Sequence, residues 1–394
     1  MSGNDYPRTE QINSERLSGM GRRRFTKTLL GLGFGTSAAI GLTVEDVKGA
    51  ASDQVPIVIG YEPNADGTDL RPVTKYVPAD WYNDNRHAKQ VHEQKATGLL
   101  KNPHIKGVGF EPGEYGGKNA EITVSVDARN KGAAATVPES VDGVPFTISY
   151  VGDYELGTCD CPSGDYNSWH SDDTVPGGMQ ICNGNGTYGT LSGRAVQNGT
   201  EYFLINNHIY GSDYKAHTGE PVYQPDCNSQ PLGEVRIGYC DWDAMLVTPK
   251  NGHDPVSRYQ DASPSENVTG FFTRPGLSDI KAAGRDIEKY GCRTGRTSGK
   301  IKNTDKWTSF YGCTPKTGQL VWGTSNKFND GDSGSVAYHE APNGNGGYTD
   351  NSIWTCGLCS ARTADWAEAT DDYVWGTSAW KLYNAEGIIL GHYS

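Results

Sequence analysis

The pattern that most limits the fold is a series of short apolar segments separated by turn residues, which extends from about residue 175 onward. Glycine accounts for 51 of the 394 residues, nearly twice its usual share of about 7%. Short strands joined by tight turns give this texture, whereas long helices do not. We therefore predict an all-β barrel or sandwich, with strands at residues 202–205, 235–237, 244–247, 299–301, 319–322, 336–338 and 353–358, and a late helix only within 373–383.

The region before this pattern has a different texture. Residues 87–100 carry a weak helical stripe of apolar side chains, and residues 107–110, 122–126 and 144–148 alternate as strands do. One helix on three short strands makes a small α/β module. We expect this module at about residues 86–152, after an extended lead-in.

Residues 1–51 have the order of an export signal. Arginines at 22–24 precede an apolar run at 29–42, which is shorter than the roughly 20 residues that cross a bilayer as a helix. The arginine pair resembles a twin-arginine signal. We predict a secreted protein without a stable membrane anchor, cleaved after Ala51 or near Ala38. A basic amphipathic surface helix is the alternative.

Nine cysteines follow residue 158 and none precedes it. In an exported protein such cysteines form disulfides, and an odd number leaves one over. Irregular spacing argues against a zinc site, although one is conceivable from Cys159, Cys161, His170 and Cys182. The uneven distribution of cysteines indicates a domain boundary before the first of them. We therefore divide the chain into the signal at 1–51, a lead-in and module at 52–152 that is a candidate pro-segment, and a cross-linked domain at 153–394.

Two further pairs of cysteines bear on this framework. Cys356 and Cys359 have the spacing of a redox pair, but they lie in a predicted strand. A structural pair or two separate bridges is therefore the preferred interpretation. Cys292 and Cys313 fit a bridge across a hairpin. Residues 153–173, which are acidic, aromatic and rich in turn formers, are predicted to form a linker or an elaborated loop.

The charge balance limits the partners. Lys and Arg number 35 against 47 Asp and Glu, which gives a net charge of -12 and a pI of about 5.2. This balance argues against general attraction to nucleic acid or anionic lipid. We expect a monomer with no nucleic-acid partner, no cofactor and no metal.

The strongest local motif surrounds Ser333, within residues 329–335 (Asn-Asp-Gly-Asp-Ser-Gly-Ser). Glycine tolerates the backbone angles of a strained turn that directs N–H groups at one point. The N–H groups of Gly331 and Ser333 would then form an oxyanion hole beside a nucleophilic hydroxyl. In so glycine-rich a chain, a turn that binds nothing is the alternative for this motif taken alone.

A serine nucleophile needs a base, and two other motifs supply the partners. His208 follows an apolar strand, and Asp243 stands at the beginning of another. The order His208, Asp243, Ser333 differs from that of the α/β-hydrolases. A hydrolase order exists in Ser333, Asp371 or Asp372, and His392, but the strand and helix alternation that it needs is not visible.

Together these motifs resemble the chymotrypsin/trypsin-like serine proteases, in particular the secreted prokaryotic branch. The resemblance covers about residues 175–394 and rests on Gly189-Thr190-Leu191, Asn207-His208, Asp243-Ala244, Cys292 to Thr297 and Gly331 to Ser335. It implies a double six-stranded antiparallel β-barrel with the site between the barrels, preceded here by the small module, which is similar to a domain found before such proteases. It also implies an endopeptidase that acts on polypeptides through an acyl-enzyme, with Ser360 bonding Asp243 and lending its backbone to the substrate.

The chain departs from this family in several places. The Ile-Val-Gly-Gly start is absent, so Asp332 needs another charge partner. The resemblance to bacterial relatives suggests Arg293 or Arg296, and we predict Arg293. Lys327 stands where trypsin has its specificity aspartate, so a preference for Lys or Arg substrates is not implied. The rival hypothesis is a secreted binding protein that keeps the barrels without turnover.

Overall fold

The computed structural model describes residues 53–64, 69–158, 174–211, 217–259, 267–309, 316–343 and 347–391. The predicted export signal lies outside these residues. No helix within the described ranges is long and apolar enough to cross a membrane.

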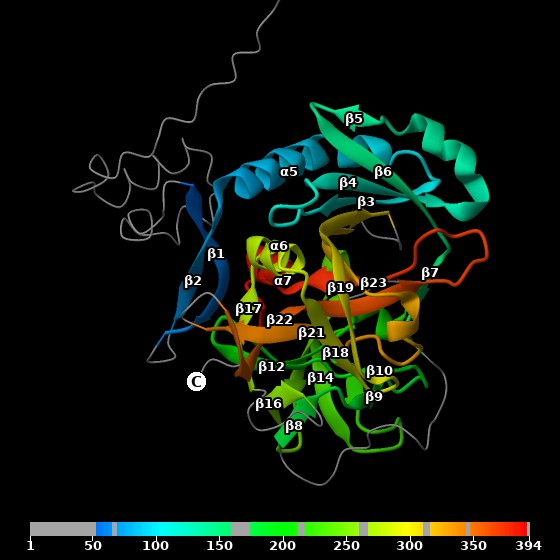
Figure 1. The fold of residues 1–394 in the computed structure, drawn as a ribbon. Helices are drawn as coiled ribbons and strands as arrows, with labels where there is room; N and C mark the ends of the chain where they lie inside the picture. Colours follow the sequence, from blue (N-terminus) through cyan, green and yellow to red (C-terminus); the bar gives the residue numbers. More distant parts are fainter. Residues whose placement is uncertain are drawn as a thin grey trace, which may run out of the picture.

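One antiparallel barrel is formed by six strands of the C-terminal half (Figure 1). Each strand pairs with the next around the ring, and the last pairs with the first. In ring order these strands are β18 (Asp286–Gly291), β19 (Gly295–Thr308), β20 (Lys316–Trp322), β23 (Val374–Ser378), β22 (Tyr348–Thr363) and β21 (Val336–Pro342). Large apolar side chains such as Trp322 and Trp354 pack in the core beside them.

A second barrel precedes it in the sequence. Its sheet order is β10-β9-β13-β14-β15-β12-β11-β24, and it closes because β10 and β11 are one bent segment that pairs with β9 before the bend and with β12 after it. The strands are β9 (Gln180–Cys182), β10 (Tyr188–Thr190), β11 (Gly193–Gln197), β12 (Thr200–Ile205), β13 (Pro221–Tyr223), β14 (Pro231–Tyr239), β15 (Ala244–Pro249) and β24 (Ile389–Leu390). A short parallel pair, β8 (Thr174–Gly177) with β16 (Asp254–Tyr259), lies beside them. The predicted all-β fold with two barrels is confirmed.

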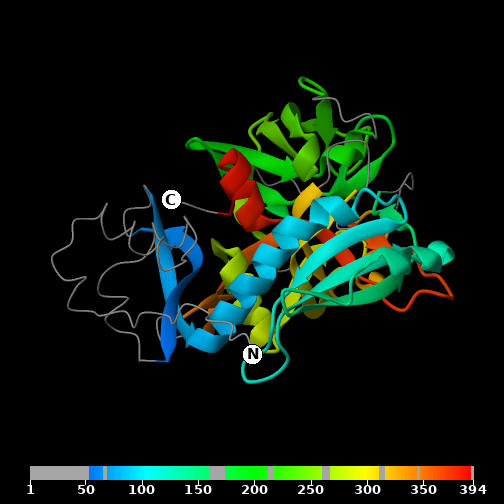
Figure 2. The ribbon, with the colours of Figure 1, turned by 90° about the horizontal axis from the view of Figure 1, so that it is seen from above.

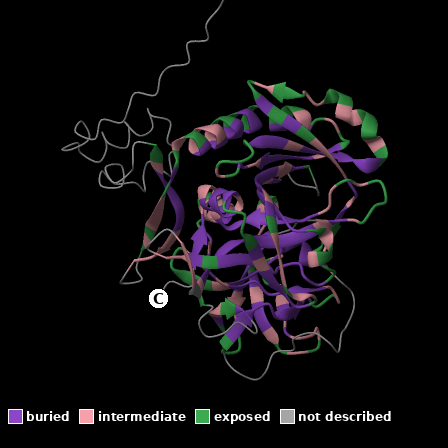
Figure 3. Ribbon diagram, in the orientation of Figure 1, coloured by how far each residue is buried: buried purple, intermediate pink, exposed green. Residues whose placement is uncertain are grey.

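The N-terminal module has the predicted composition of one helix and a small sheet. Apolar side chains of helix α5, among them Ala88 and Val91, share a core with the sheet residues Val108 and Val124, and Figure 3 shows these facing surfaces as buried. Figure 2 shows α5 crossing between this sheet and the β1–β2 hairpin. The elements are β1 (Gln54–Pro63), β2 (Leu70–Pro78), α5 (Ala79–Leu99), β3 (Ile105–Glu111), β4 (Glu121–Asp127), η1 (Ala128–Thr136), β5 (Ser140–Val141) and β6 (Val144–Val151).

The module is joined to the C-terminal barrel by strand pairing. Strand β3 pairs with β19, and β1 pairs with β17 (Asn267–Phe272), which in turn pairs with β22. The module and this barrel therefore share one sheet of 14 strands. The division of the chain at 152 remains a prediction about processing.

The sequence predictions differ from the structure at several elements, among them two α-helices. The segment predicted as a late helix starts as strand β23, which completes the barrel between β20 and β22, and only then becomes α7 (Ala379–Glu386). Tertiary strand pairing decides the conformation there. Helix α6 (Arg274–Ala282) was not predicted; it begins at Thr273, whose side chain accepts a hydrogen bond from the Gly276 N–H.

Candidate active site

His208 and Asp243 are brought together by neighbouring strands of the first barrel. His208 lies in the short helix η2 (Asn207–Tyr210) just after β12, and Asp243 immediately precedes β15, which pairs with β12. The His208 Nδ1 lies 2.6 Å from Asp243 Oδ2, and the His208 backbone N–H donates to Asp243 Oδ1 at 3.0 Å. Both side chains are buried. Asp243 has a φ of 50°, in the left-handed region that Asp tolerates better than most non-glycine residues.

The electrostatics of this pair favour an ionised carboxylate. Burial by itself would raise the pKa of Asp243, but the charge and hydrogen bonds of His208, with further help from Lys316 and Ser360, hold that pKa below its ordinary value. Asp243 can therefore fix the orientation of the imidazole ring and stabilise its protonated form.

Ser333 reaches this pair from the other barrel. It precedes β21, and its Oγ lies 2.7 Å from His208 Nε2 and 3.0 Å from the Ser360 carbonyl oxygen. Gly334 follows in a left-handed conformation, with a φ of 98°, in which an L side chain would be strained. The structure thus brings His208, Asp243 and Ser333 into one hydrogen-bonded line across the two barrels.

Two backbone N–H groups of the Ser333 turn converge on a single oxygen. The N–H groups of Gly331 and Ser333 both donate to the carbonyl oxygen of Gly157, at 2.5 and 3.1 Å. Gly331 has a φ of 101°, and its own carbonyl accepts a hydrogen bond from Thr190 Oγ1 at 2.8 Å.

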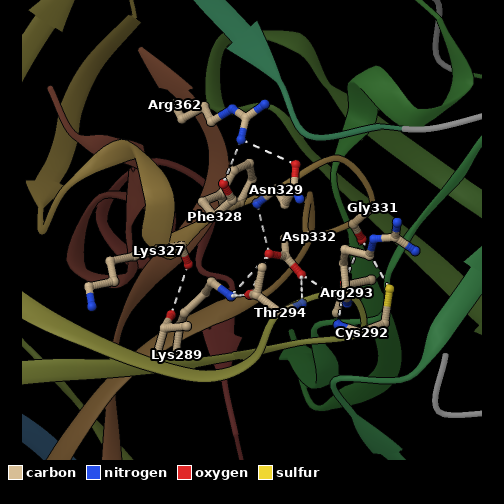
Figure 4. A network of polar contacts seen from close by, with 12 residues as sticks. Lys289, Cys292, Arg293, Thr294, Lys327, Phe328, Asn329, Gly331, Asp332 and Arg362 are labelled. Carbon is tan, nitrogen blue, oxygen red and sulfur yellow. Dashed lines mark hydrogen bonds and ion pairs between the residues drawn. The ribbon is translucent and has the colours of Figure 1, made fainter. Parts of the chain in front are cut away.

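The Asp332 carboxylate anchors the turn from behind (Figure 4). It accepts hydrogen bonds from the backbone N–H groups of Arg293 and Thr294, at 3.0 and 3.1 Å, and from Thr294 Oγ1 at 2.6 Å. Its ion-pair partner is the wholly buried Lys289, with Nζ 3.2 Å from Oδ2. The prediction of an ion pair between the Arg293 side chain and Asp332 is corrected: Arg293 contacts Asp332 through its backbone N–H, and Lys289 is the cation.

Sequence reasoning missed Lys289 because a lysine in a strand is ordinarily expected to reach solvent. The available signal was its position two residues before Gly291, on the strand that ends next to the Cys292 motif. In β18 the residues around it, Tyr290 and Gly291, are buried. A lysine within such a run needs an anion, and Asp332 is that anion.

Ser360 lies on β22, next to Ser333. Its hydroxyl accepts a hydrogen bond from Asn206 Nδ2 at 3.2 Å and contributes a hydrogen bond to Asp243. The Ser360 carbonyl faces the cleft and accepts from both Ser333 Oγ and the Gly157 N–H, the latter at 3.4 Å.

The cleft holds a segment of the chain itself, the strand β7 (Tyr154–Leu156) followed by Gly157. Strand β7 runs antiparallel to β22, with Leu156 opposite Ala361 and Glu155 opposite Arg362. The prediction of a linker or loop at residues 153–173 is wrong for residues 154–156, which form β7. The alternation of Tyr154, Glu155 and Leu156 was a strand signal too short to be recognised.

The cysteines only partly follow the predicted pattern. A disulfide joins Cys182 to Cys227, which removes Cys182 from the zinc alternative. Cys356 and Cys359 are buried thiols, so the predicted bridges are wrong there. Three residues of extended strand span about 10 Å, which is too far for the two to pair. Burial raises the pKa of Cys359 to about 11. Cys313, the predicted partner of Cys292, lies outside the described residues.

Comparisons with known proteins give fold-level likenesses only. No family model and no curated protein matches the chain. Among solved structures, a glutamic acid specific serine protease aligns with a TM-score of 0.39 at 17% identity, over 55% of this chain and 100% of its own. The Nocardiopsis protease aligns at 0.38 and 18%, and the Cellulomonas bogoriensis chymotrypsin at 0.38 and 15%, each over 56% of this chain and 100% of its own. These scores are too low to bear on the site.

Proposed function

We propose that this chain is a secreted serine endopeptidase in which His208, Asp243 and Ser333 form the catalytic triad. The observation that carries the proposal is a peptide carbonyl oxygen held by the Gly331 and Ser333 N–H groups, next to the hydrogen-bonded line from Asp243 to Ser333. Nucleophile, base, orienting carboxylate and oxyanion donors then occupy one site.

The reaction follows from these positions. His208 Nε2 accepts the Ser333 hydroxyl proton while Oγ attacks a peptide carbonyl, and Asp243 stabilises the imidazolium that forms. The developing oxyanion is held by the two N–H donors, each of which contributes about 10²-fold or more to the rate in comparable sites. His208 then protonates the leaving amine, and water hydrolyses the acyl-enzyme.

Peptides are favoured over simple esters as substrates by the strand that lines the cleft. β22 offers its backbone to an extended chain, and β7 uses that edge in antiparallel register. A strand edge of this kind recognises a polypeptide backbone. Export is part of the proposal and rests on the arginines and the short apolar run of the N-terminal segment.

The rival function, binding without turnover, differs in one measurable property, the nucleophilicity of Ser333. The experiment is prolonged labelling of the purified protein with a fluorophosphonate probe, followed by mass spectrometry of the labelled peptide. Because Gly157 occupies the site, label accumulates only as fast as that segment leaves, so incubation continues to a plateau. We expect label on Ser333 and none on Ser333→Ala. Absence of label from folded wild-type protein would favour the binding function.

A further inference from the structure

Residues 154–157 lie in the cleft as the acyl half of a substrate would. Their strand pairs with β22, the Gly157 N–H donates to the Ser360 carbonyl, and the Gly157 oxygen takes both oxyanion donors. A peptide bond whose carbonyl is held in this way is the bond that Ser333 would attack. In this chain that bond joins Gly157 to Thr158.

The space next to Gly157 is closed to any side chain. A Cβ added to Gly157 would overlap the ring of Phe328, lying 2.6 Å from its Cζ, and would stand 3.1 Å from the Asn329 carbonyl oxygen. In a substrate at this position the side chain of the residue before the cleaved bond would point at the Phe328 ring. The ring therefore fills the pocket that would otherwise select a larger residue.

Phe328 is held firmly in this position. It is wholly buried within the core of the C-terminal barrel. Its backbone N–H donates to the Ser325 carbonyl at 3.2 Å, and its own carbonyl accepts from Arg362 Nη1 at 3.0 Å (Figure 4). Moving a close-packed ring whose backbone is fixed costs free energy, because its neighbours must shift as well.

The residues before Gly157 make further specific contacts. Glu155 forms an ion pair with Arg362, at 3.1 Å between Oε2 and Nε. The hydroxyl of Tyr154 lies 3.0 Å from that of Tyr373, and its ring packs against Trp375. An acidic residue two positions before the glycine and an aromatic residue three positions before it thus match this edge of the barrel.

We propose that the site is specific for peptide bonds that follow glycine, that Phe328 determines this specificity, and that the Gly157–Thr158 bond of the chain is itself a substrate. This inference rests on the proposed function. Ser333 Oγ bonds to the Gly157 carbonyl carbon, the bond to the Thr158 nitrogen breaks, and His208 delivers the proton to that nitrogen. Water then releases the Gly157 carboxylate and restores the Ser333 hydroxyl.

Self-cleavage is tested by intact mass and N-terminal sequencing of the purified full chain. We expect wild-type protein to begin at Thr158, with the preceding segment detectable as a second polypeptide, and Ser333→Ala to stay intact at this bond. Gly157→Ala should cleave about 100-fold more slowly, because its methyl group overlaps Phe328. Gly132→Ala is the matched control, since nothing lies within 4 Å of a Cβ there, and it should behave as wild type.

The main test of specificity uses wild-type protein and two peptides, Tyr-Glu-Leu-Gly-Thr and Tyr-Glu-Leu-Ala-Thr, at equal concentration. We expect the glycine peptide to be cleaved at least about 100-fold faster.

Two variants test the role of Phe328. In Phe328→Ala the ratio of the two cleavage rates should fall toward one, and the double variant Gly157→Ala/Phe328→Ala should recover self-cleavage.

The outcomes separate this inference from the proposed function. Fluorophosphonate labelling of Ser333 together with equal cleavage of the two peptides, or with an intact Gly157–Thr158 bond in wild type, would overturn the inference and leave the function standing. No labelling and no cleavage would overturn both. Normal self-cleavage of Gly157→Ala would by itself refute the role of Phe328.

Discussion

Two of the contacts between the N-terminal segment and the C-terminal barrel differ in kind. At β3 the contact continues the sheet and includes two buried polar contacts: Lys89 pairs with Asp305 at 3.0 Å, and Lys306 donates to Ser125 Oγ at 2.6 Å. At β7 the contact is a three-residue strand whose ion pair, between Glu155 and Arg362, lies partly in solvent. The first contact resembles a protein interior, and the second resembles a bound peptide.

Because of this difference, cleavage of the Gly157–Thr158 bond would not by itself release the N-terminal segment from the barrel. If the bond after Gly157 is cut, the β3 contact still holds the segment through strand pairing, a shared core and a buried ion pair. Its new C-terminal end then stays close to the cleft and competes with substrates at a high effective concentration. Release of the segment would depend on the β3 contact and on the pairing of β1 with β17, whereas uncovering of Ser333 depends on β7 and Gly157.

The largest expected effect is on the catalytic rate, in a variant that changes the triad and leaves both contacts in place. Asp243→Asn should slow cleavage of the glycine peptide by about 10⁴-fold, because an amide leaves His208 in the wrong tautomer. The measurement is kcat, with thermal unfolding as a check on the fold. A loss below about tenfold would mean that another carboxylate, such as Asp241, orients the histidine.

Breaking the interior contact should cost stability. Lys89→Met leaves Asp305 buried beside the more distant Arg274, at 3.5 Å, and we expect the free energy of unfolding to fall by about 3 kcal/mol. Urea denaturation measures this loss. Lys250→Met, which removes a solvent-exposed pair with Glu234, should cost less than about 1 kcal/mol. Equal losses in both variants would contradict an interior-like contact.

The same contact should make stability depend on pH. Burial lowers the pKa of Lys306 to about 7 from its ordinary value of 10.5. Between these values the unfolded chain binds a proton that the folded chain lacks, so the free energy of unfolding should rise with pH, by roughly 2 kcal/mol from pH 7 to pH 9. Lys306→Met should flatten this slope. A wild-type slope that Lys306→Met leaves unchanged would show that Lys306 keeps its proton in the fold.

The contrast between the two contacts also explains what the sequence could predict. The sequence reveals the three proposed triad residues, His208, Asp243 and Ser333, because each follows or precedes an apolar strand. That pattern is local and can be recognised from the sequence alone. The barrels are visible for the same reason, since short strands and glycine turns are local features. The domain boundaries and the export signal remain predictions.

The sequence could not reveal features that depend on distant pairing. Lys289 is the partner of Asp332 only because β18 lies beside β21, and nothing in either segment names the other. Gly157 looks like any turn glycine until β7 is placed on β22. Phe328 stands just before the Ser333 motif, but its role follows from the space beside Gly157 and not from its position in the chain.

The smallest expected effect concerns the cleft contact. The carboxylate of Glu155 and the guanidinium of Arg362 are 45% and 23% exposed, and such pairs contribute about 0.2–1 kcal/mol. Glu155→Gln should therefore let β7 leave the cleft more often and raise the rate of fluorophosphonate labelling about twofold. Glu368→Gln, a loop glutamate paired with Lys131 at 3.4 Å, should leave that rate unchanged. A rise of tenfold or more would mean that this ion pair, and not the backbone pairing with β22, holds the segment in place.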